Sequence, residues 1–242
     1  MPRFPPGGML LGAMRIGRLV PMLLFVLALC TGACGPPKYP SDATNTVVSL
    51  TQIDCAECGD EIVADMRTRP GVYEASFDKR KAEVVVVASP SFDVFTTVRQ
   101  LAAQKGFAAL LGAGKGEYKS RIPFPAGVDA ATVVEDGKDV PDLGPVLVKG
   151  KVTVVDFSAL WCEPCRKVDE HMVKVLGERK DVAYRRLEIG DWDTPLAQRY
   201  LKGVPSLPYI EVYGTSGAKV DTIAGLDLAK LDAAIARGSG AP

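Results

Sequence analysis

Residues 154–167 read VVDFSALWCEPCRK, and this stretch decides the fold of the second half of the chain. Its first residues belong to an apolar run, Val152–Ser158. Such a run is typical of a central strand in a sheet that is covered on both faces. A single acid, Asp156, interrupts that run. A C-x-x-C motif, Cys162 and Cys165, then begins a pattern typical of a helix. We therefore predict a buried strand, a turn that carries the two cysteines, and a helix.

The rest of this half alternates between strand and helix patterns. Strands are predicted at residues 182–189, 209–213 and 219–224, and helices at 194–201 and 226–237. Pro205 and Pro208 precede the strand at 209–213. A proline inside a strand removes a hydrogen bond from the ladder, so Pro208 should stand at the entry of that strand. Strands that alternate with helices are typical of an α/β domain.

These features together resemble thioredoxin. The resemblance spans residues 126–242 and depends on the V-D-F-S-A-L-W-C run, the C-x-x-C at a strand-to-helix turn, and Gly203–Tyr209, which matches the stretch ending in that family's cis-proline. Its nearest counterparts are membrane-tethered or periplasmic reductases. The resemblance implies a thioredoxin fold and a thiol–disulfide oxidoreductase without a cofactor at its redox site. Its partners would be protein thiols and disulfides and an upstream thiol reductant.

The resemblance also implies roles for individual residues. Cys162 is expected to be exposed at the helix start and to attack a substrate disulfide, and Cys165 to resolve the mixed disulfide. Asp156 would lie beneath the pair and exchange a proton with Cys165. Trp161 would shield the site, and Pro208, joined to Leu207 by a cis peptide bond, would shape the groove for the substrate backbone.

The first half of the chain has a different order of elements. Its patterns predict a strand at 46–53, a helix at 55–69, a strand pair at 72–77 and 82–88 with a turn at Asp78-Lys79-Arg80, a helix opened by Ser89-Pro90-Ser91, and a strand at 107–111. This βαββαβ order is the ferredoxin-like split unit. We therefore predict an α+β ferredoxin-like domain at 45–112, a linker at 113–125, and the thioredoxin-like α/β domain at 126–242.

The first half also resembles the heavy-metal-associated domain of copper chaperones, metal-pump N-termini and mercuric-ion scavengers. The motif Cys55-Ala56-Glu57-Cys58 follows the first strand. Pro70-Gly71-Val72 before the second strand and Lys105-Gly106-Phe107 before the last strand also match that family. Two thiolates at a helix N-terminus suit Cu(I) or Hg(II). Four acids surround the pair and disfavour thiolates: Asp54, Glu57, Asp60 and Glu61. Metal binding, redox cycling and an inert disulfide therefore all remain open for Cys55 and Cys58.

The N-terminal residues predict export. Arginines precede a short apolar run, residues 19–30, and small residues follow it, which is typical of a signal peptide at 1–33 that could start at Met14. The run is too short to span a bilayer. Thr31-Gly32-Ala33-Cys34 resembles a lipobox, so we expect lipid on Cys34, with simple secretion as the alternative. Gly35 after the cysteine favours the outer membrane, and residues 34–44 form a tether on the periplasmic side.

Composition excludes several classes of protein. The 29 basic and 29 acidic residues balance, which argues against a nucleic-acid partner. The single histidine, His171, rules out a multi-histidine metal site within one chain and should face away from the cysteines of its helix. With Cys30 in the signal and Cys34 lipidated, four cysteines remain as two C-x-x-C pairs. These pairs are too far apart in sequence for a typical zinc ribbon.

Three functions are consistent with these patterns. The first is a lipid-anchored periplasmic reductase with an appended C-x-x-C module for soft metals or thiol relay; Glu163, beside Cys162, favours the reducing direction. The alternative is a copper- or mercury-binding protein whose thioredoxin domain keeps Cys55 and Cys58 reduced, and the third is an inactive scaffold for interactions. For a relay, we expect the acids around Cys55 to meet Arg166 and Lys167, with a flexible tether at 112–116.

Overall fold

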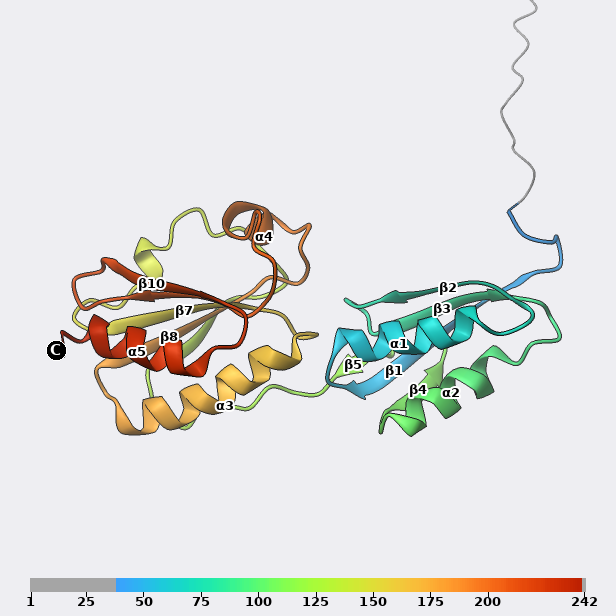
Figure 1. Ribbon diagram of the computed structural model, residues 1–242, viewed down its shortest axis with the longest axis horizontal. Coiled ribbons are helices and arrows are strands. Elements are labelled where there is room, and N and C mark those ends of the chain that lie inside the picture. The colour runs from blue at the N-terminus through green and yellow to red at the C-terminus, as the bar shows by residue number, and fades with distance from the viewer. Residues whose placement is uncertain (1–37, 241–242) are drawn as a thin grey trace, which may run out of the picture. The chain divides into compact units, whose positions relative to one another are not determined.

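The computed structural model describes residues 38–240, which form two five-stranded sheets, each with its own helices (Figure 1). We call residues 44–118 the first module, residues 130–238 the second module, and residues 119–129 the connecting segment. The predicted signal peptide and Cys34 lie outside the described residues. Among the residues described, no helix combines the length and the hydropathy that crossing a bilayer requires.

The first module follows the predicted βαββαβ order. Its sheet has the strand order β2-β3-β1-β4, with every one of these neighbours antiparallel, and a short fifth strand pairs with β1 in parallel. Both helices lie on the same side of the sheet (Figure 1). The elements are β1 (Thr44–Ile53), α1 (Ala56–Arg67), β2 (Val72–Asp78), β3 (Glu83–Ala88), α2 (Val94–Gln104), β4 (Ala108–Leu111) and β5 (Glu117–Tyr118).

Local chemistry sets these boundaries. The turn between β2 and β3 is held by Asp78, whose Oδ1 accepts the backbone N–H of Arg80 at 3.1 Å. Helix α2 begins later than predicted, because Asp93 caps it and accepts the Thr96 N–H at 3.0 Å. Helix α1 lies very close to β2 at Gly59, where a Cβ would stand 2.4 Å from the Phe77 ring.

The glycine-rich stretch at 112–116 is folded onto the first module, so the prediction of a flexible tether there is wrong. The Gly112 N–H donates to the Val47 carbonyl at 2.8 Å, and the Lys115 N–H donates to Ser49 Oγ at 3.2 Å. A Cβ on Gly116 would stand 1.8 Å from the Lys81 carbonyl oxygen. Gly116 therefore allows close backbone approach, whereas Gly112 and Gly114 adopt positive φ angles that turn the chain.

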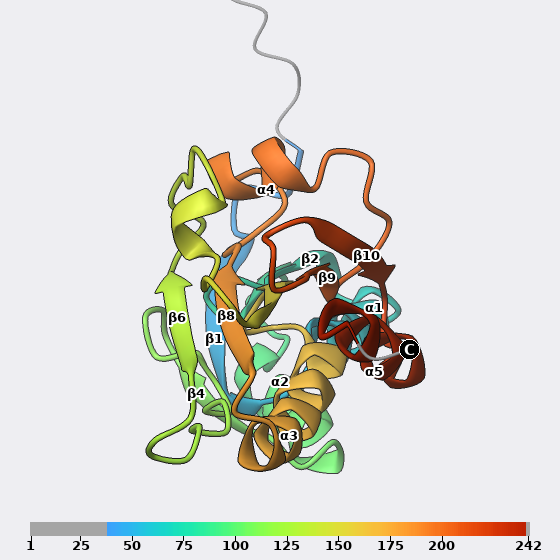
Figure 2. The same ribbon diagram turned by 90° about the vertical axis from the view of Figure 1, so that its left-hand side faces the viewer.

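The second module surrounds a central strand, β7, that is buried along its whole length. The strand order is β10-β9-β7-β8-β6; β7 runs parallel to β8 and antiparallel to β9. Helices α3 and α5 cover one face of this sheet, and α4 lies on the other (Figures 1 and 2). The elements are β6 (Ala130–Val134), a 3₁₀ turn (Gly144–Val146), β7 (Val152–Ser158), α3 (Glu163–Glu178), β8 (Val182–Glu188), α4 (Pro195–Tyr200), β9 (Tyr209–Tyr213), β10 (Lys219–Ala224) and α5 (Leu228–Gly238).

The strands and helices predicted from residue 152 onward are confirmed to within about two residues at each end, whereas β5 and β6 were missed. Strand β6 is an edge strand that pairs only with β8, and its central residues are exposed. Its sequence, AATVV, is mostly apolar and ends in β-branched residues, so a strand signal is present, but the run is short and its three central residues face solvent. Strand β5 is two residues long and carries no periodic signal.

Candidate functional site

The second C-x-x-C pair lies at the start of α3, directly after the central strand. Cys162 and Cys165 form a disulfide with their Cα atoms 5.4 Å apart. Cys162 is the N-cap of the helix, and its sulfur accepts the backbone N–H of Cys165 at 3.2 Å. A thiolate on Cys162 would keep this donor and the positive end of the helix dipole, both of which lower the pKa of a thiol. The position therefore suits a nucleophile.

Trp161 and the segment before β9 border the same sulfur. The indole Nε1 of Trp161 donates to the Gly190 carbonyl at 2.7 Å, and its ring packs against Trp192 with centroids 6.3 Å apart. The Leu207–Pro208 peptide bond is cis, which confirms the predicted isomer. Leu207 and Cys162 line one cleft.

Asp156 is fully buried on β7, the strand that precedes the cysteines in the chain. The Tyr184 hydroxyl donates to its Oδ2 at 2.5 Å, while its Oδ1 has no hydrogen-bond partner among the described residues. Burial raises the pKa of Asp156 to about 6, although the Arg121 charge and the Tyr184 hydrogen bond act to lower it. A carboxyl with this pKa can both accept and release a proton near neutral pH.

A buried ion cluster surrounds Asp156, and sequence analysis did not predict it. Asp169, on α3, accepts Arg121 Nε at 2.6 Å, Arg186 Nη2 at 2.6 Å and the Tyr184 hydroxyl at 3.1 Å. The Asp169 side chain is fully buried, and the two arginines are nearly so. Two signals could have revealed the cluster: an arginine inside the apolar strand β8, and an acid four residues after Cys165 in the same helix.

Cys162 is only 4% exposed, so the prediction of an exposed sulfur is wrong for this arrangement. The reason lies in the first module. The Ala56 N–H, between the two cysteines of the first pair, donates to the Trp161 carbonyl at 3.1 Å. Ala56 and Glu57 thus line the cleft that contains Cys162, and the first C-x-x-C loop lies against the second.

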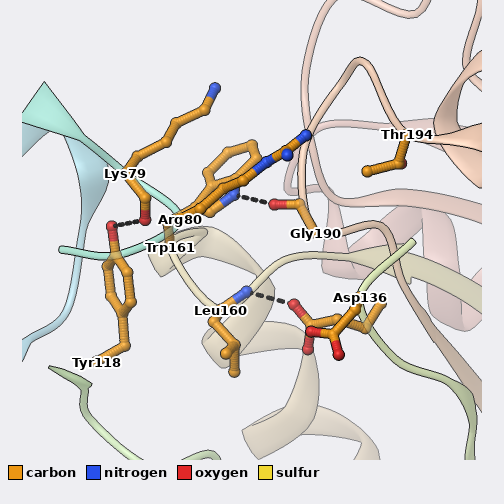
Figure 3. A pocket seen from close by; sticks show the side chains of 9 residues that line it. Lys79, Arg80, Tyr118, Asp136, Leu160, Trp161, Gly190 and Thr194 are labelled. Carbon is orange, nitrogen blue, oxygen red and sulfur yellow. Dashed lines mark hydrogen bonds between the residues drawn. The ribbon is translucent and has the colours of Figure 1, made fainter. Parts of the chain in front are cut away.

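Two basic residues of the first module hold the contact. Lys79 pairs with Asp191 at 2.8 Å, and Arg80 pairs with Asp191 and Asp193. Lys79 Nζ also lies 4.5 Å from the centroid of the Trp161 ring. Figure 3 shows Lys79 and Arg80 extending over Trp161 beside the Gly190 carbonyl. These two cations and two carboxylates thus join the turn after β2 to the segment after β8.

The ion pairs expected between the first acidic loop and Arg166 or Lys167 do not form. Lys167 pairs with Glu163 in its own helix at 3.0 Å, and Arg166 donates to the carbonyls of Ser120 and Leu160. For Lys167, Glu163 is available one helical turn away on the same helix. Burial lowers the pKa of Arg166, and the Asp54 charge acts on it without a direct ion pair and has the smaller, opposite effect. Complementary charge exists between the modules, but it lies in the Lys79 and Arg80 pairs.

The first pair, Cys55 and Cys58, is also a disulfide, with Cα atoms 5.5 Å apart. Its helix-cap geometry repeats that of the second pair, because Cys55 accepts the Cys58 N–H at 3.2 Å. Asp54 is the third group that could hold a metal ion here, with candidate ligand atoms within 4.8 Å of one another. Asp54 Oδ2 is paired with Lys119 at 2.8 Å. Two thiolates would be available to a soft metal only after the disulfide is reduced.

His171 lies apart from both pairs, as expected. It lies in the middle of α3, and its Nε2 is 2.6 Å from Asp232 Oδ1 on α5. It therefore links two helices of the second module and does not take part in the redox site.

The second module is similar in sequence to thioredoxins. The thioredoxin family model matches residues 145–237. The thioredoxin of Malassezia sympodialis is 33% identical over 93 residues, which cover 37% of this chain and 83% of that protein. Horse thioredoxin (Equus caballus) is 29% identical over 85 residues, which cover 35% and 77%. The X-ray structure of Fasciola hepatica thioredoxin is 30% identical and covers 38% of this chain and 84% of its own, with a TM-score of 0.31.

The match includes the strand, the cysteine pair and the cis-proline segment described above. The chain therefore belongs to the thioredoxin family, and its second module is a thioredoxin-like disulfide oxidoreductase with the thioredoxin fold.

Proposed function

We propose that this protein is a lipid-anchored periplasmic disulfide reductase whose first module is its in-chain redox partner. One observation carries the proposal: the backbone hydrogen bond from Ala56 to Trp161, which sets the two C-x-x-C loops against each other. The first module is proposed to be a ferredoxin-like, heavy-metal-associated-type domain. Its strand order β2-β3-β1-β4 and its two helices on one face support this assignment.

The geometry of the second module supports the proposed residue roles. Cys162 is the proposed nucleophile, because it is the helix N-cap and receives an N–H on its sulfur. Cys165, one helical turn on, is the resolving thiol. Asp156 is the proposed proton acceptor for Cys165, since no described residue donates to its Oδ1 and burial raises its pKa to about 6. Trp161 and Leu207 line the cleft that contains Cys162, and Pro208, joined to Leu207 by the cis peptide bond, is proposed to shape it.

The relay is a two-electron exchange. A Cys162 thiolate attacks one sulfur of the Cys55–Cys58 disulfide, whose S–S bond breaks as a mixed disulfide forms. The sulfur that leaves takes up a proton. Cys165 then loses its proton to Asp156, and its thiolate attacks Cys162, releasing the second sulfur of the first pair. Cys55 and Cys58 end as a dithiol, Cys162 and Cys165 as a disulfide, and an upstream dithiol reductant restores the second pair.

We expect reduction to reach the first pair through the second. Protein with both pairs oxidised is given a limiting dithiol, quenched with acid, and alkylated at successive times. Label should appear at Cys162 and Cys165 first and then at Cys55 and Cys58, and Cys162→Ser should slow the second phase. Mass spectrometry of the labelled peptides measures both phases.

A docking variant gives a matched control for that experiment. Replacing Lys79 and Arg80 by Glu removes the pairs with Asp191 and Asp193 without touching a cysteine. It should slow label at the first pair and leave label at the second pair unchanged, and Lys at positions 191 and 193 should restore the rate. Equal rates at Cys55 and Cys58 in wild type and in Cys162→Ser contradict the relay.

Soft-metal binding is the second candidate function of the first module, favoured by the grouping of Asp54, Cys55 and Cys58. Cu(I) or Hg(II) would be held by the two thiolates, with the Asp54 carboxylate as a third donor. The same docked geometry would then keep this pair reduced for metal capture. Competition between a Cu(I) chelator and the reduced chain, with and without Cys55→Ser, separates this function from a relay alone.

The anchoring proposal depends on Cys34 and the segment before it. We expect Cys34→Ala to release the protein from membranes or to block its processing, because acyl burial contributes ~0.8 kcal/mol per CH₂. Radiolabelled palmitate and membrane fractionation measure the two effects. Labelling that persists in the Cys34→Ala protein would point to Cys30 and overturn the assignment; separation of inner and outer membranes tests the proposed outer-membrane location.

A further inference from the structure

Arg121 lies outside both modules in sequence, yet its side chain enters the buried ion cluster of the second module. Only 7% of that side chain is exposed. Nε pairs with Asp169 at 2.6 Å, and Nη1 donates to Ser158 Oγ and to the Ala159 carbonyl, each at 3.3 Å. These two acceptors belong to the strand end that leads from Asp156 to the cysteines. Arg121 therefore spans the space between the core cluster and the redox turn.

The neighbours of Arg121 hold it in place from both modules. The Lys119 N–H donates to the Ile53 carbonyl at 2.9 Å, and its Nζ pairs with Asp54 beside the first cysteine pair. The Ser120 carbonyl accepts Arg166 Nη1 at 3.2 Å, directly after Cys165. Three consecutive residues of the connecting segment thus contact both redox loops. The segment predicted to be a linker is part of the site.

We propose that Arg121 is a positioning residue for the redox reaction: its buried charge keeps Asp156 ionised and so able to take the proton of Cys165. The proposal rests on the role given above to Asp156. Charged and titratable groups face Asp156 from three further elements: Asp169 on α3, Tyr184 and Arg186 on β8, and Arg121 on the connecting segment.

Among these groups, Arg121 has the strongest charge effect on Asp156. Burial raises the pKa of Asp156, and the Arg121 charge is the largest influence that lowers it, ahead of the Tyr184 hydrogen bond; Arg186 contributes least. Nη2 of Arg121 and Oδ1 of Asp156 are both buried without a hydrogen-bond partner among the described residues. The cation thus acts on the carboxylate through its field and leaves Oδ1 free to receive a proton.

The test isolates the proton-transfer step in the full chain. Cys30 and Cys34 are replaced by Ala and Cys55 and Cys58 by Ser, so that Cys162 and Cys165 are the only thiols. The reduced chain is mixed with 5,5′-dithiobis(2-nitrobenzoate), which forms a mixed disulfide on Cys162. Attack by Cys165 then releases a second thionitrobenzoate, and the rate of this release is measured by absorbance from pH 5 to pH 9.

Arg121→Met should move the midpoint of this pH profile upward by roughly one unit, because a removed cation raises the pKa of the acid it faces. Release should be about fivefold slower at pH 6 and close to wild type at pH 9. Arg121→Lys, which keeps the charge, should retain the wild-type midpoint. Arg199→Met removes an exposed arginine paired with Asp139 and should change nothing. If Arg121→Met does not fold, the midpoint in Arg121→Gln, which lacks the charge, is compared with the midpoint in Arg121→Lys, which keeps it.

Asp156→Asn separates failure of this proposal from failure of the Asp156 assignment. The Asn variant should lose the acidic limb of the profile, which is the fall in release rate at low pH. Adding Arg121→Met to this variant should cause no further change in the pH dependence. An acidic limb that persists in Asp156→Asn overturns the role of Asp156 and, with it, that of Arg121. Two other results would overturn the Arg121 proposal alone. In the first, the decline in rate at low pH depends on Asp156, but its midpoint in folded Arg121→Met equals that of wild type. In the second, Arg121→Met loses the same fraction of its rate at every pH.

Discussion

Cys162→Ser is expected to abolish disulfide reduction by this protein, lowering the rate of dithiol-dependent insulin reduction by at least about 10³-fold. Attack on a disulfide needs a thiolate, and a serine hydroxyl stays protonated in this pH range. The capping geometry survives, because a serine oxygen also accepts the N–H at a helix start. The loss is therefore chemical, and the far-ultraviolet circular dichroism spectrum should not change.

Cys165→Ser is the matched variant for that experiment. It keeps the nucleophile but removes the thiol that resolves the mixed disulfide, so covalent complexes with substrate should accumulate and disappear with excess reductant. Non-reducing electrophoresis detects them. Normal turnover in Cys162→Ser, or complexes that form through Cys165 instead, would reverse the assignment of the two sulfurs.

Asp169→Ala should lower the free energy of unfolding by about 3–5 kcal/mol, because it leaves two buried arginines without their shared acid. Arg121 and Arg186 each donate to Asp169 at 2.6 Å, and the Asp169 side chain is fully buried. Urea denaturation at neutral pH measures the change. Most of this cost is the desolvation of unpaired charge.

Asp181→Ala is the control for the ion-pair prediction. Asp181 pairs with Arg179 at 2.6 Å, but its side chain is 46% exposed, so the loss should be at most about 1 kcal/mol. A loss near 1 kcal/mol in Asp169→Ala as well would mean that water reaches the cluster. The cluster would then not be the low-dielectric site on which the Arg121 argument depends.

The redox turn could be predicted because its signals are local. The apolar run of β7, the cysteine spacing and the placement of Pro208 each depend on residues that are close together in the chain. The structure confirms β7, the helix after it and the cis peptide bond at Pro208. Strand β6, AATVV, carries only a short β-branched signal at the edge of the sheet, and it shows neither a long apolar run nor an alternation of apolar and polar residues.

The ion cluster could not be predicted from local patterns. Asp156, Asp169, Tyr184 and Arg186 come from three elements, and Arg121 comes from a stretch that has the composition of a linker. Asp156 stands out within its apolar run, and so does an arginine within β8, but nothing local shows which charges they meet. Their charges become informative only when the sheet and α3 exclude water from the space between them.

Sequence alone determined which residues are the redox cysteines, because spacing and helix capping act over a few residues of chain. Tertiary structure decided what surrounds their sulfurs. It buries Cys162 beneath the first module, places Lys79 and Arg80 on Asp191 and Asp193, and brings Arg121 into the buried ion cluster on Asp169. The reason is physical: burial and electrostatic fields depend on distances through space, and these distances join residues that the chain keeps far apart.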